Sequence, residues 1–222
     1  MSLTYLFETF QEESAFAAAH GTDPARLAGL IAQRLFPAPS YTLAYAPDGG
    51  GWITSYFGTH ADTASYRFHL KAHGRWLADI DRFGLDEEAQ AEAFFRARYI
   101  AARDAFLAGA LGRKLAAAMP DVAAGFDDGQ IAASWRHFLD GTFGVCTRDG
   151  QPETIFLKEA CASFVERMAD GPGGDGHADL LVPTVDLLDR VLSPFAPHEV
   201  ERSSRQRWVN DMRAQLPGPQ PG

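Results

Sequence analysis

The chain has 222 residues, of which 46% are hydrophobic and 22% charged, and its formal net charge at pH 7 is −9. This composition is typical of a folded domain with a sizeable core, and the negative charge disfavours nucleic acid and anionic membrane surfaces as partners. With only Cys146 and Cys161, the sequence offers neither a disulfide framework nor the thiolates of a structural zinc site.

The start of the chain and its apolar stretches bear on location. The opening "MSLTYLFETFQEESAF" contains acidic residues and no basic region, unlike a signal peptide. No later apolar run reaches the ~18 residues that a membrane span needs. We therefore expect a soluble protein of a reducing cytoplasm, with no membrane partner.

The first part of the chain predicts two helices and a short strand. Apolar residues recur at helical spacing over 2–19, and Thr22 and Pro24 mark the cap and the first turn of a second helix, which stops before "FPAPSY". An extended "SYTLAY" follows. Residues 5–45 thereby resemble the helix-turn-helix with a short strand found at the start of mercury-resistance-type regulators.

The middle of the chain predicts a loop and then long helices. The glycine-rich run "YAPDGGGWITSYF" predicts at most a small hairpin near 41–57, or a loop over a pocket. Helical periodicity then returns over 62–80 and 86–118, which predict bundle helices. The run "MPDVAAGFDDGQ" breaks this pattern. We place a boundary there, between an N-terminal helical region (1–120) and a C-terminal one (129–216).

The C-terminal region predicts further helices, separated by glycine and proline. A helix with one apolar face stops at Gly141, Pro152 opens a second helix, and Pro183 opens a third. Residues 217–222 predict a disordered tail. The predicted fold class is therefore mainly α and helical-bundle-like.

Cys146 is the first catalytic candidate. It follows Gly144 in a short run interpreted as non-helical, with Arg148 two residues on and a helix N-terminus beyond, all of which favour a thiolate. The alternative is a small buried residue in a tight turn. Cys161, within an apolar stripe, is predicted to pack in the core.

His137 and Lys158 are the other catalytic candidates. At about 100° per residue, His137 lies opposite Trp135 and Leu139 on its helix, so it faces water or a cleft. A solvated surface histidine is the alternative to a general acid or base. Lys158 flanks the apolar stripe of its helix, where a lysine that extends its ammonium into water is the alternative to a chemical role.

A helix start with basic neighbours predicts a site for a small anion. Ser203, with a glutamine three residues later, forms a capping-box pattern, and Ser204 and Arg205 lie beside the free N–H groups of that helix. We expect Arg148 to join this site where the two regions meet. The alternative is a plain helix cap whose arginine ties down the last helix. The anion site predicts that Arg205→Ala weakens ligand binding more than Arg213→Ala does.

Metal and cofactor signals are weak. His69 and His73 are four residues apart on a predicted helix, a spacing that lets two imidazoles share one metal. No glutamate stands beside either histidine as in the zinc-protease helix motif, so we predict no metal site and no stoichiometric transition metal. The sequence also has no phosphate loop, dinucleotide fingerprint or serine elbow, which leaves the cofactor unknown.

The C-terminal half carries one wider pattern, in "SWRHFLDGTFGVCTRDGQPETIFLKE" and "VDLLDRVLSPFAPHEVERSSRQRWV". This pattern resembles a bacterial family of unknown function whose members are described as natural product biosynthesis proteins. The residues that carry the resemblance are Trp135, Cys146, Arg148, Pro152, Glu153, Lys158, Asp186, Asp189, Pro194, Phe195, Ser204 and Arg205. The resemblance implies a role in a biosynthetic gene cluster without defining a reaction.

Two functions are open on this reading. The first is a tailoring or accessory enzyme that acts on a small anionic or amino-acid-like substrate. The second is a non-catalytic binding protein, either a helix-turn-helix regulator or an adaptor for a biosynthetic protein partner. Against DNA binding, the segment that would read DNA offers only Arg26 and Arg34, too few for the phosphate contacts that usually dominate affinity.

Overall fold

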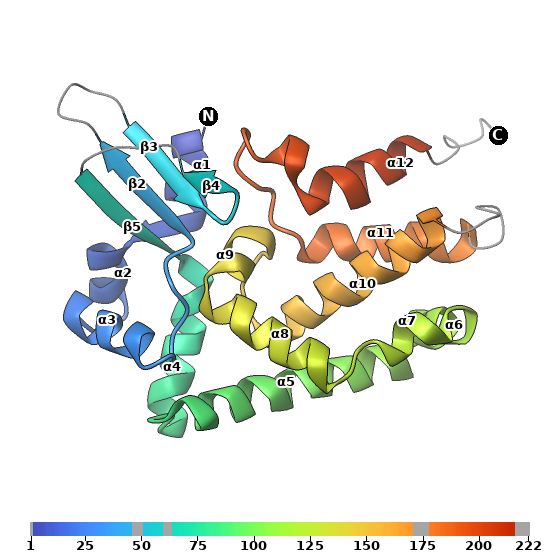
Figure 1. Ribbon diagram of the computed structural model, residues 1–222, viewed down its shortest axis with the longest axis horizontal. Helices are drawn as coiled ribbons and strands as arrows, with labels where there is room; N and C mark the ends of the chain where they lie inside the picture. The colour runs from blue at the N-terminus through green and yellow to red at the C-terminus, as the bar shows by residue number, and fades with distance from the viewer. Residues whose placement is uncertain (1, 46–50, 60–63, 171–177, 216–222) are drawn as a thin grey trace.

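The computed structural model describes residues 2–45, 51–59, 64–170 and 178–215 (Figure 1). Over these residues the fold is mainly α-helical, as the sequence predicts, with one antiparallel sheet at one end. None of the helices in these ranges has the length and apolarity of a membrane span.

The strands are β1 (Phe10–Glu12), β2 (Tyr41–Tyr45), β3 (Gly51–Ser55), β4 (Gly58–Thr59) and β5 (Ala64–Leu70). The helices of the first half are α1 (Ser2–Thr9), α2 (Glu13–Ala19), α3 (Pro24–Ala32), the short η1 (Lys71–His73), α4 (Gly74–Phe83), α5 (Glu88–Ala108) and α6 (Ala110–Ala118). Those of the second half are α7 (Pro120–Ala124), α8 (Asp128–Leu139), α9 (Thr142–Cys146), α10 (Pro152–Asp170), α11 (Ala178–Val191), η3 (Val200–Arg202), the π-helical turn η4 (Gln206–Asn210) and α12 (Asp211–Gln215).

The sheet has the strand order β1-β5-β2-β3-β4 and is antiparallel throughout. On its inner face, Phe10 stands opposite Leu70, and Tyr41 stands opposite Phe68. The rings of Phe10 and Tyr41 meet edge to face with centroids 4.8 Å apart. These aromatic side chains bury one face of the sheet against the helices, while on the other face His69 packs against Phe16 and Phe36 and Thr42 stays partly exposed.

The helices of the second half form a stack beside the sheet (Figure 1). Helix α10 packs between α5 and α11, and α11 also contacts η4 and α12. The sequence of α10 explains this central position, because Phe156, Phe164 and Cys161 are all fully buried on its two covered sides. The predicted packing role of Cys161 is thereby confirmed, and burial raises the pKa of its thiol to about 12.

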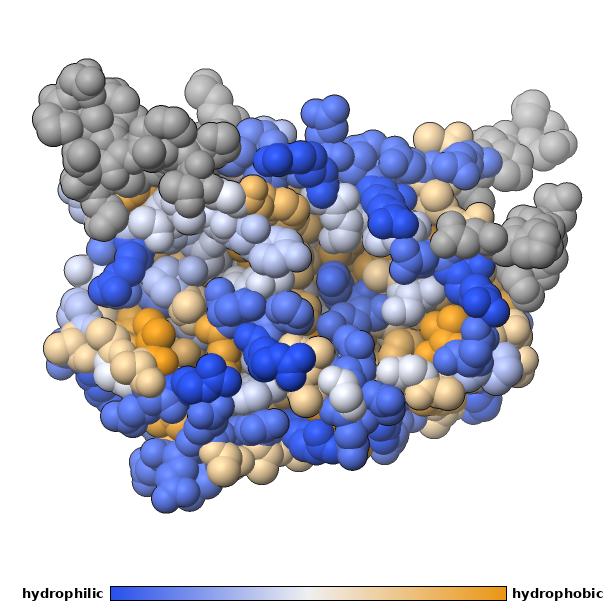
Figure 2. Space-filling model, viewed as in Figure 1, coloured by the Kyte–Doolittle hydropathy of each residue, from blue (hydrophilic) through white to orange (hydrophobic). Residues whose placement is uncertain are grey.

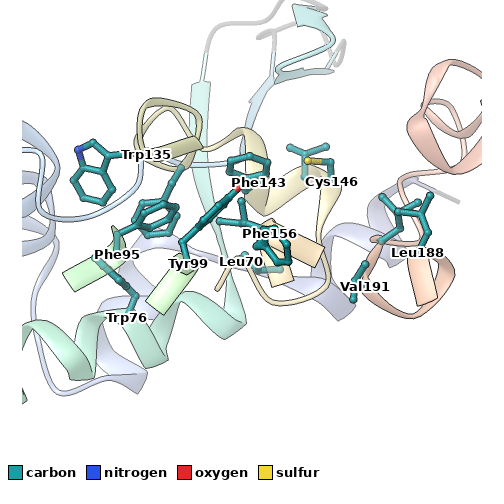
Figure 3. Close-up of a cluster of buried hydrophobic side chains, with 14 of the residues drawn as sticks. Leu70, Trp76, Phe95, Tyr99, Trp135, Phe143, Cys146, Phe156, Leu188 and Val191 are labelled. Atoms are coloured by element: carbon teal, nitrogen blue, oxygen red, sulfur yellow. The ribbon is translucent and has the colours of Figure 1, made fainter. Parts of the chain in front are cut away.

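Trp76 of α4 lies in the core and is 0% exposed. Its ring contacts Phe95 of α5 and Trp135 and Phe138 of α8, with centroids 6.4, 6.2 and 4.9 Å away, and its Nε1 donates to the Leu35 carbonyl at 2.8 Å. Figure 3 shows how this cluster continues through Tyr99 and Phe156 toward Leu188 and Val191 of α11. One buried cluster therefore connects the sheet end with the helical stack.

Hydrophilic side chains cover most of the face shown in Figure 2, with smaller hydrophobic patches between them. This distribution fits a chain with 29 acidic and 20 basic residues. Much of the charge is paired across helices, as in the contact of Arg98 with Asp79 at 2.9 Å and with Glu153 at 2.7 Å.

The sheet is larger than the small hairpin predicted near 41–57, because part of the helix predicted over 62–80 is strand β5. Tyr66, Phe68 and Leu70 recur every second residue, which is the period of a strand, and pairing with both β1 and β2 satisfies that segment's backbone. The helical part, α4, begins only at Gly74.

Two predicted helix boundaries also differ. Strand β1 interrupts the helix predicted over 2–19, and Glu12 then caps α2 by accepting a hydrogen bond from the Ser14 N–H at 2.9 Å. Helix α11 begins at Ala178 rather than at Pro183. Pro183 is exposed, so the backbone carbonyl that loses its N–H partner can be hydrated.

Candidate functional site

A cavity of about 410 Å³, here called the central cavity, opens between α8, α9, α10 and the turn that joins β3 to β4. Its aromatic walls come from Phe57, Phe143 and Phe195. Its polar side chains include His137, Ser204, Lys158 and Glu159. A concave apolar surface with a few convergent polar groups is the usual form of a small-molecule site.

Gly141 places α9 against this cavity. Its φ of 84° lies in the left-handed region, and a Cβ at this position would stand 2.8 Å from the Ala38 carbonyl oxygen. Only glycine fits both constraints, so the chain turns sharply after α8. That turn brings Phe143 and Cys146 to the cavity wall.

Lys158 supplies a cation that has no protein carboxylate at salt-bridge distance among the described residues. Its Nζ instead lies 5.7 Å from the centroid of the Phe143 ring. A cation over an aromatic face gains a modest electrostatic attraction and remains able to bind an anion. The sequence predicted Lys158 as a candidate, and the structure places it at the cavity.

Glu159 supplies an anion beside it and was missed in the sequence. Its Oε1 accepts from Gln130 Nε2 at 2.9 Å, and its Oε2 accepts from Tyr99 OH at 2.8 Å and Ser134 Oγ at 2.7 Å. All three donors are neutral, and no cation pairs with Glu159 within the described part of the chain. Burial, followed by the charge of Glu159, raises the pKa of Tyr99.

Cys146 is the last residue of α9, not part of a non-helical run, and it is 8% exposed. Burial raises the pKa of its thiol, the charge of Lys158 opposes that rise, and the charge of Glu159 adds to it. Arg148, expected to favour the thiolate, is exposed and donates to the Asp189 carbonyl at 3.3 Å. The thiol is therefore protonated near neutral pH in this structure.

His137 lies where the helical wheel predicts, with its side chain 49% exposed while Trp135 and Leu139 on the opposite side are buried. Its Nδ1 is 3.2 Å from Asp140 Oδ2, and its ring meets Phe143 edge to face at 6.3 Å. A proton on Nδ1 shared with Asp140 leaves Nε2 as the atom that exchanges protons with a ligand.

The predicted anion site divides into two parts. Ser204 lines the central cavity, whereas Ser203 is buried and accepts from the Gln206 N–H at 3.2 Å, which confirms the predicted helix cap. Arg205 turns toward α11, where its Nη1 donates to Asp189 Oδ1 at 2.6 Å and its Nε to the Ser193 carbonyl at 2.8 Å. The structure thus brings His137, Cys146, Lys158 and Ser204 together, and leaves Arg148, Ser203 and Arg205 outside the lining.

Arg205 and Arg213 both hold Asp189 of α11. Arg213 Nη1 donates to Asp189 Oδ2 at 2.7 Å and its Nη2 to Asp186 Oδ1 at 2.8 Å, so this exposed side chain forms ion pairs with both carboxylates. Burial opposes the charge of Asp189, yet the hydrogen bonds from Arg213 and Arg205 hold the pKa of that carboxyl below its usual range.

We expect Arg205→Ala to lower the free energy of unfolding by about 2 kcal/mol, because it removes hydrogen bonds to a carboxylate and to three carbonyls in a half-buried place. Urea unfolding measures this change. Ligand affinity per folded molecule should stay constant, since the guanidinium lies outside the cavity lining. A stable variant with weakened binding would instead restore Arg205 to the site.

His69 and His73 do not share a helix. His69 is the next-to-last residue of β5, with its Nε2 3.2 Å from Glu13 Oε2. His73 lies in η1, and neither of its ring nitrogens has a hydrogen-bond partner within the described residues. The metal spacing considered from the sequence depended on a helix that the strand β5 replaces. Among the described residues, no group of three or more metal-ligating side chains is present.

The turn after β3 is fixed by a buried carboxylate. Glu199 is 1% exposed and accepts from Tyr41 OH at 2.5 Å and from Ser55 Oγ at 2.8 Å. The same Ser55 oxygen accepts from the Phe57 N–H at 3.1 Å, and the Phe57 ring meets Phe195 edge to face at 6.2 Å. This chain of contacts joins the sheet to the segment after α11 and holds one wall of the cavity.

Some of the missed residues carried a signal in the sequence. Gln130, Ala133 and His137 recur at positions i, i+3 and i+7, which places them on one side of α8, and all three line the cavity. Glu159 follows the predicted Lys158 on the flank of α10. Phe57 carried no such signal, because only the tertiary fold brings the sheet to these helices.

Comparison with protein families gives a match over the C-terminal part of the chain. A family model described as "Family of unknown function (DUF6058)" matches residues 91–217, which is more than half of the chain and includes the cavity walls from α8, α9 and α10. No curated protein and no solved structure matches the chain. The resemblance to a family of unknown function is confirmed at this level: the chain belongs to DUF6058.

Proposed function

We propose that this chain is a tailoring or accessory enzyme of natural product biosynthesis that binds a small anionic, amino-acid-like substrate in the central cavity. The observation that carries the proposal is the pair Lys158 and Glu159. Both line the cavity, and neither is paired with an opposite charge among the described residues. A carboxylate and an ammonium on one small ligand complement this pair.

Charge and shape support a zwitterion in particular. Half-buried charges lose part of their hydration, and an opposite charge on a ligand restores the lost interaction through charge-assisted hydrogen bonds. The ligand carboxylate is assigned to Lys158 and its ammonium to Glu159. The rings of Phe57, Phe143 and Phe195 then accept an apolar or aromatic body.

His137 and Cys146 are the groups proposed for chemistry. His137 Nε2 is proposed to remove or deliver a proton, with Asp140 holding the ring through Nδ1. Cys146 is proposed as the nucleophile because it lines the same cavity as His137, and because the charge of Lys158 opposes the rise in its thiol pKa that burial causes.

Three related probes test the binding proposal by calorimetric titration. L-phenylalanine carries both charges, 3-phenylpropionate only the carboxylate, and phenethylamine only the ammonium. We expect Lys158→Met to weaken L-phenylalanine and 3-phenylpropionate at least tenfold, a loss of about 1.4 kcal/mol, and to leave phenethylamine unchanged.

Lys114→Met is the matched control, because it removes the same charge from an exposed position on α6 outside the cavity. Its affinities should equal those of the unmodified chain. An equal loss of affinity in both lysine variants would show that the protein's net charge, and not Lys158 itself, determines binding. Failure of all three probes to bind would contradict the proposal and favour the non-catalytic adaptor or regulator.

A further inference from the structure

A second cavity of about 310 Å³, here called the side hollow, adjoins the central cavity and shares Tyr56 and Thr142 with it. Its floor is the face of the sheet opposite Tyr41, where Thr42 of β2 stands directly across from Thr54 of β3. The loop that joins α8 to α9 closes the other side. The two cavities are therefore neighbouring parts of one larger depression.

The chemistry of the side hollow differs from that of the central cavity. Among the described residues of its lining, Asp140 alone is charged. Aliphatic hydroxyls dominate instead, from Ser40, Thr42, Thr54, Ser55 and Thr142. A hydroxyl both donates and accepts hydrogen bonds, so such a lining complements neutral groups that do the same, and Asp140 repels anions.

Two of these hydroxyls are available to a ligand, because Ser40 Oγ, which also has no hydrogen-bond partner within the described residues, is buried. Thr142 Oγ1 already donates to Asp140 Oδ1 at 2.5 Å, and Ser55 Oγ already donates to Glu199. The hydroxyls of Thr42 and Thr54 have no hydrogen-bond partner within the described residues. A ligand hydroxyl or amide between these two threonines would satisfy both.

Tyr56 marks the junction of the two cavities. Its side chain is 68% exposed, which is the highest exposure among the large hydrophobic residues described. Its ring meets Phe57 edge to face at 5.4 Å, so it continues the aromatic wall of the central cavity outward. An exposed aromatic ring between two cavities offers a stacking surface to a ligand that passes from one to the other.

We infer that the substrate carries, beside its charged head, a neutral polar arm of hydroxyl or amide groups that crosses Tyr56 and lies in the side hollow. This inference rests on the proposed function for the head group. The arm itself is recognised by Thr42 and Thr54, which discriminate a hydroxylated substrate from an analogue without the hydroxyls because the threonines would then stay unpaired.

The test uses two probes that report the two cavities separately. N-acetyl-D-glucosamine, which carries hydroxyls and an amide but no charge, represents the arm, and L-phenylalanine represents the head. In an NMR titration of the full chain, we expect the arm probe to shift the backbone amides of Thr42, Thr54 and Tyr56. The head probe should shift those of Phe143 and Lys158, and both probes should shift Thr142.

The double variant Thr42→Val and Thr54→Val should weaken N-acetyl-D-glucosamine at least fivefold and leave L-phenylalanine unchanged. Valine keeps the shape and the strand preference of threonine, so the sheet is retained, and an unchanged Tm verifies this. Thr154→Val, on α10 and outside both linings, is the control.

Unchanged affinity for N-acetyl-D-glucosamine in the double variant, or no shift at Thr42 and Thr54, would overturn the inference. If the unmodified chain binds N-acetyl-D-glucosamine but not L-phenylalanine, the proposed head-group site is refuted and the side hollow is still supported. The two failures are therefore distinguishable in one set of titrations.

Discussion

Trp76→Ala is expected to lower the free energy of unfolding by about 3–5 kcal/mol, the range for truncating a large buried aromatic side chain. Trp76 is 0% exposed, and its ring contacts α5 and α8 together. Its removal leaves a cavity there and takes the Nε1 donor from the Leu35 carbonyl. In a chain of this size, the Tm should fall by roughly 10 °C, measured by calorimetry or by circular dichroism.

Phe83→Ala on the same helix is the control for this prediction. Phe83 is 51% exposed, although its ring also contacts Phe94 at 4.9 Å. Its truncation should cost less than about 1 kcal/mol, because most of its surface already faces water. Similar losses in the two variants would show that the core is not centred on Trp76.

Acid is expected to destabilise the protein through His73. This side chain is fully buried, and neither of its nitrogens has a hydrogen-bond partner within the described residues. Burial, with a smaller contribution from His69, lowers the pKa of His73 from 6.5 to about 3. Below pH 6.5, His73 is protonated in the unfolded chain but stays neutral in the folded chain. The free energy of unfolding therefore falls as the pH falls toward 3.

The expected size of this effect is about 1.4 kcal/mol per pH unit, or about 2 kcal/mol between pH 6.5 and pH 5. Glu13 and Asp189, whose pKa values are lowered, add their own acid sensitivity only below about pH 4.5. Urea unfolding at pH 7 and pH 5 thus isolates the histidine.

His73→Leu should remove most of the dependence of the free energy of unfolding on pH between 7 and 5. The variant should fold normally, because no hydrogen bond within the described residues is lost. Leucine also remains compatible with the surrounding rings of Phe36 and Phe138. If the free energy of unfolding of this variant depends on pH as it does in the unmodified chain, the acid sensitivity comes from another group.

The long helices were predictable from the sequence, and the sheet largely was not. Helices α5 and α10 run for 21 and 19 residues with recurring apolar side chains and without glycine or proline in their interiors, so a helix was the expected structure. Strand β1 has three residues and gains its stability only by pairing with β5, which is distant in the sequence. The local sequence of β1 therefore does not show the strand with which it pairs.

The candidate site was predictable where helix geometry decides the outcome. The orientation of His137 follows from the 3.6-residue period, and the same argument extends to Gln130. Arg205 shows the opposite case, because a long cationic side chain pairs with whichever carboxylate the fold brings close, and Asp189 lies on another helix. Ion pairs between helices, such as that of Arg205 with Asp189, depend on how the helices pack and cannot be predicted from the local sequence.

The hydrogen bonds from Ser55 to Glu199 and from the Phe57 N–H to Ser55 bear on how a ligand exchanges with solvent. Lifting this turn would leave a Glu199 oxygen without its donor in a place that is 1% exposed, which is energetically costly. We therefore expect the turn to stay in place while a ligand binds. Exchange should run past the half-exposed His137 side, so binding rates should be insensitive to motions of the sheet and limited by diffusion and ligand desolvation at that opening.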